Sequence, residues 1–141
     1  MMESQKALLR SLLERALTQN PEDTQTLAAL FYTRLFTIAP GVRPLFSNKL
    51  SLQEAKFTQM LESLISSLDR LDNLVPTLWQ SGRNHKLYGA EDAHYAVVGE
   101  ALLYALEAKL GVEQLTDEVR AAWKAFYDLV ALIMQESAKS A

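Results

Sequence analysis

Apolar residues recur along this chain at intervals of three and four positions, the spacing that places side chains on one face of an α-helix. The pattern predicts helices over residues 3–18, from residue 21 to just before residue 40, and over residues 51–71, 74–85, 93–110 and 116 onward. Nowhere do apolar and polar residues alternate over the length of a strand. The expected fold class is therefore all-α.

Short polar or breaking segments separate the helical stretches. Asn20 is expected to cap the second helix, with Pro21 in its first turn. Residues 40–46 are expected to form only a short helical turn, because they contain two prolines and a glycine. Ser51 and Glu54 match a capping box that would open the helix over residues 51–71. Gly111 is expected to end the helix over residues 93–110.

About seven helices of unequal length are expected, and they do not suit a regular four-helix bundle. A short, structured connection between the second and third long helices indicates that these two meet at a steep angle. Helices that cross at about 50° are typical of folds that enclose a cofactor pocket. We interpret residues 1–141 as a single domain.

Composition excludes several classes of function. Hydrophobic residues make up 49% of the chain, and the net charge of −3 argues against a nucleic-acid surface. Cysteine is absent from the sequence, which excludes disulfides and thiolate metal sites. No apolar run is long enough to span a membrane, and the first residues lack the features of a signal peptide. We expect a cytoplasmic protein.

The candidate chemistry lies with two histidines, His85 and His94. Their spacing of nine residues, without an acidic residue three or four positions after them on the same helix, does not suit a hydrolytic zinc site. Serine-nucleophile motifs and glycine-rich phosphate loops are missing from the sequence. A histidine near a helix end is more often structural than a ligand, but a haem needs only one neutral imidazole in an apolar slot.

Four segments of the sequence together resemble globins. The first is residues 31–46, which contain FYTRLF at 31–36, Pro40 and RPLF at 43–46. The other three are residues 82–89 (GRNHKLYG), residues 94–103 (HYAVVGEALL) and residues 121–127 (AAWKAFY). The resemblance covers nearly the whole chain. It is closest to bacterial single-domain globins and the globin half of flavohaemoglobins, with a similarity to neuroglobins over residues 99–123. It implies a globin fold of about seven helices around haem b.

The resemblance implies a role for each matching residue around the iron. His85 falls on the proximal histidine, the iron ligand, and the backbone carbonyl of Ser81 would accept a hydrogen bond from its second ring nitrogen. Phe46 falls on the phenylalanine that stacks against the haem. Tyr32 and Gln53 match the residues above the gas ligand. The simpler alternatives are that Phe46 and Tyr32 are plain core residues and that Gln53 faces solvent.

Further matches concern the edges of the pocket. Phe57, one turn after Gln53, would wall the gas pocket, and Tyr95 matches a tyrosine that supports the proximal histidine in flavohaemoglobins. The glutamate that completes that support is replaced by Ala138. Arg83 and Lys86 are candidate partners for the haem propionates. For His94, a propionate contact and a solvated position both remain open.

Three functions remain open at this point. The first is reversible binding of O2, or of NO or CO, for storage, transport or sensing. The second is nitric oxide dioxygenation, which would require a separate reductase because the sequence shows no flavin or nicotinamide motif. The third is a globin-fold signalling module without haem. Apolar faces on the last helices are compatible with a monomer or a homodimer.

Overall fold

A computed structural model describes residues 3–18, 25–46, 49–87 and 89–139. The helices in these ranges, listed in chain order, are α1 (Glu3–Leu17), α2 (Leu27–Ile38), the 3₁₀ helix η1 (Pro40–Leu45), α3 (Leu50–Ser66), η2 (Leu71–Asn73), α4 (Leu74–Leu87), α5 (Asp92–Leu110), η3 (Val112–Gln114) and α6 (Asp117–Lys139). The described residues contain no strand. The all-α expectation is therefore confirmed, with η1 as the short turn expected after α2.

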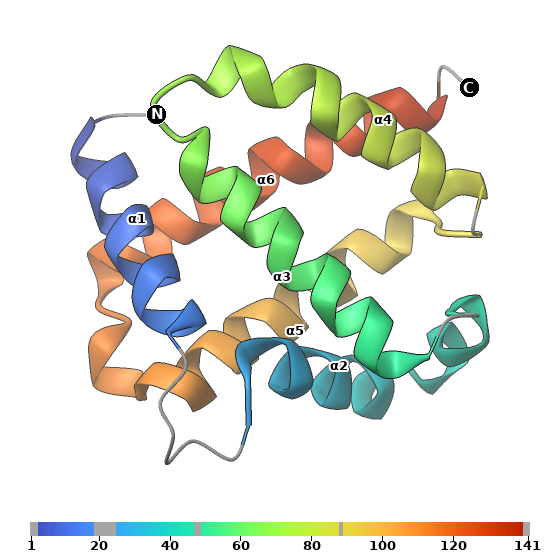
Figure 1. The fold of residues 1–141 in the computed structure, drawn as a ribbon, viewed down its shortest axis with the longest axis horizontal. Helices are drawn as coiled ribbons and strands as arrows, with labels where there is room; N and C mark the ends of the chain where they lie inside the picture. The colour runs from blue at the N-terminus through green and yellow to red at the C-terminus, as the bar shows by residue number, and fades with distance from the viewer. Residues whose placement is uncertain (1–2, 19–24, 47–48, 88, 140–141) are drawn as a thin grey trace.

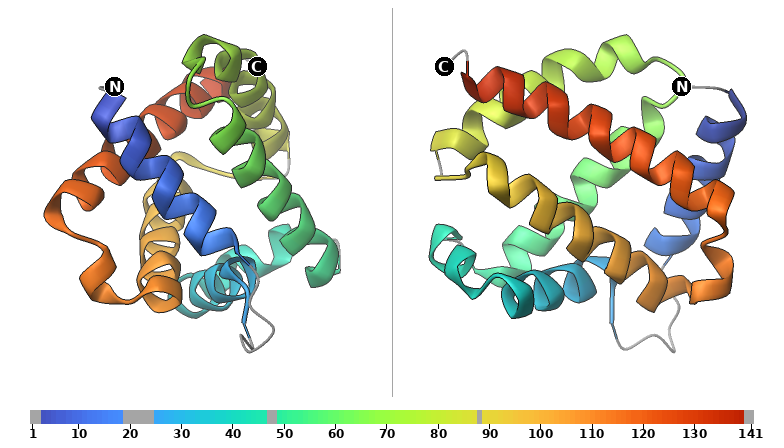
Figure 2. Two further views of the ribbon diagram at one scale, coloured as in Figure 1. Left: turned by 60° about the vertical axis from the view of Figure 1, so that its left-hand side comes forward. Right: turned by 180° about the vertical axis from the view of Figure 1, so that it is seen from behind.

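The helices cross one another at steep angles rather than forming a parallel bundle. In Figure 1, α3 runs diagonally across the front, and α5 and α6 lie behind it. The reverse view in Figure 2 brings α5 and α6 to the front. The two most extensive helix pairs are α4 with α6 and α2 with α5. As a result, α5 and α6 support α2 and α4, whereas α3 packs against α1 and α2.

Leucines, alanines and aromatic side chains from most of the helices meet in one core. The side chains that are almost completely excluded from solvent include Leu12 and Leu13 of α1, Leu78 of α4, Leu106 of α5 and Phe126 of α6. Burial of each large apolar side chain contributes about 1.5–3 kcal/mol to folding. None of the helices in the described ranges is long and apolar enough to cross a membrane.

The starts of two helices differ from the sequence-based expectation. Helix α2 begins at Leu27, and the hydroxyl of Thr26 caps it by accepting a hydrogen bond from the Ala29 N–H at 3.1 Å. The expected cap, Asn20, lies outside the described residues. Helix α3 begins at Leu50, with Lys49 at the N-cap position and no side-chain cap, so the capping box proposed at Ser51 is wrong. Ser51 lies inside the first turn, since the helix begins one residue earlier.

Helix α4 is held closely against α6. A Cβ atom placed on Gly82 would lie 2.3 Å from the backbone oxygen of Met134, so only glycine allows the two backbones to approach this closely. The buried hydroxyl of Ser137 donates a hydrogen bond to the carbonyl of Trp79. These contacts fix the position of α4 along α6. His85 lies in the last turn of the same helix.

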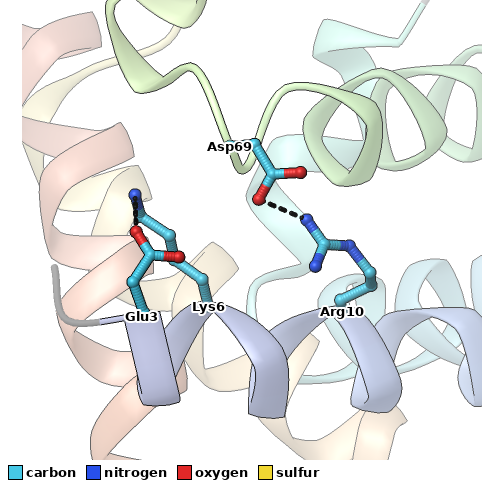
Figure 3. Close-up of polar contacts among 4 residues, drawn as sticks. All are labelled: Glu3, Lys6, Arg10 and Asp69. Carbon is cyan, nitrogen blue, oxygen red and sulfur yellow. Dashed lines mark hydrogen bonds and ion pairs between the residues drawn. The ribbon is translucent and has the colours of Figure 1, made fainter.

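Ion pairs on the surface add little to this arrangement. Figure 3 shows Arg10 of α1 paired at 2.9 Å with Asp69, which follows α3, and Lys6 paired with Glu3 within α1. Helices α1 and α3 lie next to one another in the left view of Figure 2. The carboxylates of Asp69 and Glu3 are largely exposed, and such pairs contribute about 0–1 kcal/mol. The apolar core holds α1 in place.

Candidate functional site

A cavity of about 190 Å³ lies between α2, η1, α3, α4 and the start of α5. Eight of its lining residues are apolar: Phe31, Leu35, Val42, Leu45, Phe46, Phe57, Ala90 and Val98. Its four polar lining residues are Tyr32, Gln53, His85 and His94. Of these lining residues, His85 is exposed to solvent, whereas Tyr32 is buried. The site is thus an apolar slot with a few polar groups.

The imidazole of His85 is oriented by the backbone of its own helix. Its Nδ1 lies 2.6 Å from the carbonyl oxygen of Ser81, one turn earlier, and 3.3 Å from the hydroxyl of the same residue. Because a carbonyl only accepts hydrogen bonds, Nδ1 carries the proton and donates it. In the neutral ring, Nε2 then keeps its lone pair and is available as a metal ligand. The hydrogen bond expected from the sequence between His85 and Ser81 is present.

Tyr32 and Gln53 come to the same cavity from α2 and α3. The Tyr32 side chain is buried, and its hydroxyl is hydrogen-bonded to the Gln53 side chain. Burial raises the pKa of Tyr32 to about 12, with the Gln53 contact acting in the opposite direction. Tyr32 is therefore protonated at neutral pH. The cavity contains a phenol and an amide, each able to donate a hydrogen bond.

Aromatic rings surround this polar pair. Phe57 of α3 stacks on Phe31 of α2 with 4.6 Å between ring centroids. Phe46, just after η1, meets the edge of Tyr32 at 5.6 Å and 82°. Offset-stacked and edge-to-face contacts of this kind stabilise a pair by about 0.5–1.5 kcal/mol beyond simple burial. The rings hold the Tyr32 side chain in place and make this part of the cavity apolar.

Three other residues singled out in the sequence lie outside the cavity lining. Tyr95 packs against the core, and its backbone carbonyl accepts a hydrogen bond from the Tyr127 hydroxyl at 2.5 Å. Lys86 donates to the carbonyl of Ala138 at 2.9 Å, near the C-terminus of α6, where a cation is favoured by the helix dipole. Arg83 is exposed on α4. The structure therefore brings His85, Phe46, Tyr32, Gln53 and Phe57 together, but not these three.

His94 has a local partner that the sequence reading missed. At the start of α5, its Nδ1 accepts a hydrogen bond from the Glu91 backbone N–H at 2.9 Å, while the Glu91 side chain accepts one from the His94 N–H. This is a capping box with histidine in the place usually taken by Glu or Gln. The available signal was an acidic residue followed three positions later by a polar residue, just before an apolar run.

The residues that line the cavity fit a haem. It presents one neutral imidazole with a free Nε2, surrounded by aliphatic and aromatic side chains, which is the environment that haem iron and its porphyrin need. In the described ranges, no three His, Asp or Glu side chains come together as a metal-ion site would require. The donor set thus favours a large apolar cofactor with one axial ligand over a bare metal ion.

Helices crossing around such a slot define the globin class of fold. Residues 29–134 match the profile of the Globin family, and the chain belongs to this family. Globins bind haem and gaseous ligands, so this chain is a haem-binding, gas-binding protein of that family.

Similar proteins come from several branches of the family. The neuroglobin of Danio rerio is 31% identical over an alignment of 119 residues, and the alignment covers 74% of each chain. A flavohemoprotein of Bacillus subtilis is 28% identical over 110 residues, which are 76% of this chain but only 27% of that protein. The globin chain therefore spans about a quarter of this longer relative.

Solved structures of globins have the same fold. An engineered carbene transferase, made from a putative nitric oxide dioxygenase of Rhodothermus marinus, has a TM-score of 0.81 at 24% identity, with 99% of this chain and 94% of that chain covered. A bacterial globin from Campylobacter jejuni has a TM-score of 0.79 at 21% identity, with 99% and 97% covered. The globin fold expected from the sequence is thereby confirmed.

Proposed function

We propose that this globin holds haem b through Nε2 of His85 and binds O2 reversibly beside Tyr32 and Gln53, for storage, transport or sensing. The observation that carries the proposal is the hydrogen bond from His85 Nδ1 to the Ser81 carbonyl, which leaves Nε2 with a lone pair in an apolar cavity. Haem iron supplies the position at which a diatomic gas binds, and it leaves partial negative charge on the gas. All other contributions come from the side chains of this chain.

Tyr32 and Gln53 supply donors for that negative charge. A hydrogen bond to a charged acceptor contributes about 1.5–3 kcal/mol, which corresponds to about one to two decades in affinity. The phenol is a donor at neutral pH because its pKa, about 12 after burial, lies far above that pH. Phe46 and Phe57 exclude water from the pair, which strengthens the electrostatic contribution. We therefore expect slow release of O2.

Gln53 also influences which ligands reach the iron. An amide side chain is a much poorer iron ligand than an imidazole, and Gln53 lies where many globins carry a histidine. We expect the sixth coordination position to stay open to gas or water.

Nitric oxide dioxygenation is the second candidate, favoured by the similarity to a flavohemoprotein and to a putative nitric oxide dioxygenase. In this reaction nitric oxide, O2 and one electron give nitrate. The described helices form the globin fold, so the electron would have to come from a reductase outside them. We place either activity in the cytoplasm, in a monomer or homodimer.

The test is a titration of the purified chain with haem, followed by reduction and exposure to O2. We expect one haem per chain and a spectrum that O2 changes and argon restores. Nitrate formed from nitric oxide over many turnovers, and only with added reductase, would favour the dioxygenase instead. A chain that retains no haem would contradict both and leave a haem-free signalling module.

A further inference from the structure

The two histidines of this chain line one cavity in opposite tautomers. His85 donates from Nδ1 to the carbonyl of Ser81, so its Nε2 has a lone pair. His94 accepts at Nδ1 from the backbone N–H of Glu91, so in its neutral ring the proton is on Nε2. One imidazole therefore presents an acceptor or ligand, and the other presents a donor.

The other donors near the cavity lie on α2 and α3 or outside its lining. Tyr32 and Gln53 are hydrogen-bonded to each other. Lys86 donates to the carbonyl of Ala138, and Arg83 is not among the residues that line the cavity. The Nε2–H of His94 is a further side-chain donor in the described cavity lining, and it comes from α5 whereas Tyr32 and Gln53 come from α2 and α3. The residues next to it on this side, Ala90 and Val98, are apolar.

We propose that His94 binds a carboxylate of the cofactor through its Nε2–H, at the start of α5. The inference rests on the proposed haem function, because haem b carries two propionate carboxylates. The hydrogen bond at Nδ1 fixes the tautomer that a carboxylate requires, so the capping box orients the ring for binding. The contact supports the cofactor from α5, whereas His85 supports it from α4.

A matched pair of substitutions tests the hydrogen-bond donor at position 94 separately from the role of this residue in capping α5. Both His94→Gln and His94→Glu retain an oxygen that accepts from the Glu91 N–H, as in an ordinary capping box. Only the glutamine keeps a donor, and the glutamate repels a carboxylate. Haem affinity, measured by quenching of tryptophan fluorescence, is expected to be at least about tenfold lower for the glutamate variant than for the glutamine variant.

The same pair is then titrated with haem dimethyl ester, which lacks the carboxylates. We expect the difference between the variants to shrink to within about threefold. Ala93→Gln and Ala93→Glu make the same change of charge at an exposed neighbour that does not line the cavity, and they control for long-range repulsion.

The proposal would be overturned if the ratio of affinities between the His94→Gln and His94→Glu variants were the same for haem and for its dimethyl ester. It would also be overturned if the Ala93→Gln and Ala93→Glu variants showed the same ratio of haem affinities as the His94 pair. Either result would leave the haem function itself intact, provided that the unsubstituted chain binds haem. A chain that binds neither cofactor would instead contradict the function proposed above.

Discussion

Tyr32 is the most deeply buried of the four polar residues that line the cavity, with 3% of its surface exposed. Its position between Phe46 and Phe57 leaves the hydroxyl only a narrow range of orientations. A hydrogen bond from a buried donor in apolar surroundings stabilises its acceptor more than one from an exposed donor, because water does not compete for the acceptor. Gas retention should therefore depend on this hydroxyl.

Replacement of Tyr32 by Phe removes the hydroxyl and keeps the ring. We expect the rate of O2 dissociation to rise about 10- to 100-fold, from the loss of about 1.5–3 kcal/mol. Stopped-flow mixing of the oxygenated protein with excess CO measures this rate. Tyr104→Phe, on an exposed part of α5, is the control and should not change it. An unchanged rate for Tyr32→Phe would show that the phenol does not contact the gas.

At the residue scale, the sequence predicted the members of the site better than their surroundings. His85, Phe46, Tyr32, Gln53 and Phe57 all line the cavity, and it was the resemblance to globins that grouped them. The hydrogen bond from His85 to the Ser81 carbonyl, which the resemblance also implied, is present.

The orientation of other side chains depends on contacts between helices, which spacing alone does not fix. Lys86 is drawn away from the cavity because the end of α6 offers it the Ala138 carbonyl. Tyr95 lies on a face of α5 that packs against the core, beside Tyr127. His94 was placed near the cavity edge, but its cap with Glu91 required the structure.

At the scale of elements, the close crossing of α4 and α6 determines where His85 lies. A methyl group at Gly82 would overlap the backbone of Met134, and backbone atoms cannot move aside as a flexible side chain does. Gly82→Ala should lower the free energy of unfolding by about 1–3 kcal/mol and weaken haem binding, since α4 must shift. Urea unfolding and haem titration measure the two effects.

Gly41→Ala is the matched control, because its new Cβ would meet no atom within 4 Å. Stability and haem affinity close to those of the unsubstituted chain are expected there. If both alanine variants behaved alike, the close approach of α4 to α6 would not be what positions His85.

Helix starts provide a second test at this scale. Thr26→Ala should lower the free energy of unfolding by about 1 kcal/mol, because it removes the acceptor for the Ala29 N–H. Ser51→Ala should leave stability within about 0.5 kcal/mol, since Ser51 is an exposed residue inside α3. Thermal and urea unfolding of both variants compare the caps directly. A larger loss of unfolding free energy in Ser51→Ala than in Thr26→Ala would support the capping box expected at Ser51.

Helix cores were more predictable than helix ends. Apolar periodicity identified the long helices, because burial of one face stabilises them whatever residue caps them. The start of α2 was misplaced because Asn20 and Thr26 are both acceptable caps, and tertiary packing selects between them. The steep crossing angles were inferred only from unequal lengths and short connections.

At the scale of the whole molecule, buried tyrosines make stability depend on alkaline pH. Burial raises the pKa of Tyr32 to about 12, and it also raises the pKa of Tyr127, whose hydroxyl donates to the Tyr95 carbonyl. The folded protein thus keeps these protons at pH values where the unfolded chain, with pKa values near 10, releases them. The stabilisation is complete below pH 10 and is lost as pH rises through about 12.

The free energy of unfolding should therefore fall between pH 9 and pH 12, by about 2–3 kcal/mol for Tyr32 alone. Urea unfolding followed by circular dichroism across this range measures the slope. Tyr32→Phe should flatten it, whereas Tyr104→Phe should not. A slope that is the same in all three proteins would mean that Tyr32 is accessible to water.

The most direct test of the account is whether His85 is the iron ligand. Resonance Raman spectra of the reduced, haem-loaded protein should show an iron–imidazole stretching band. The band should disappear in His85→Gly, return when free imidazole is added, and persist in His94→Gly. A band that survives unchanged in His85→Gly, or that vanishes only in His94→Gly, would contradict the axial role of His85.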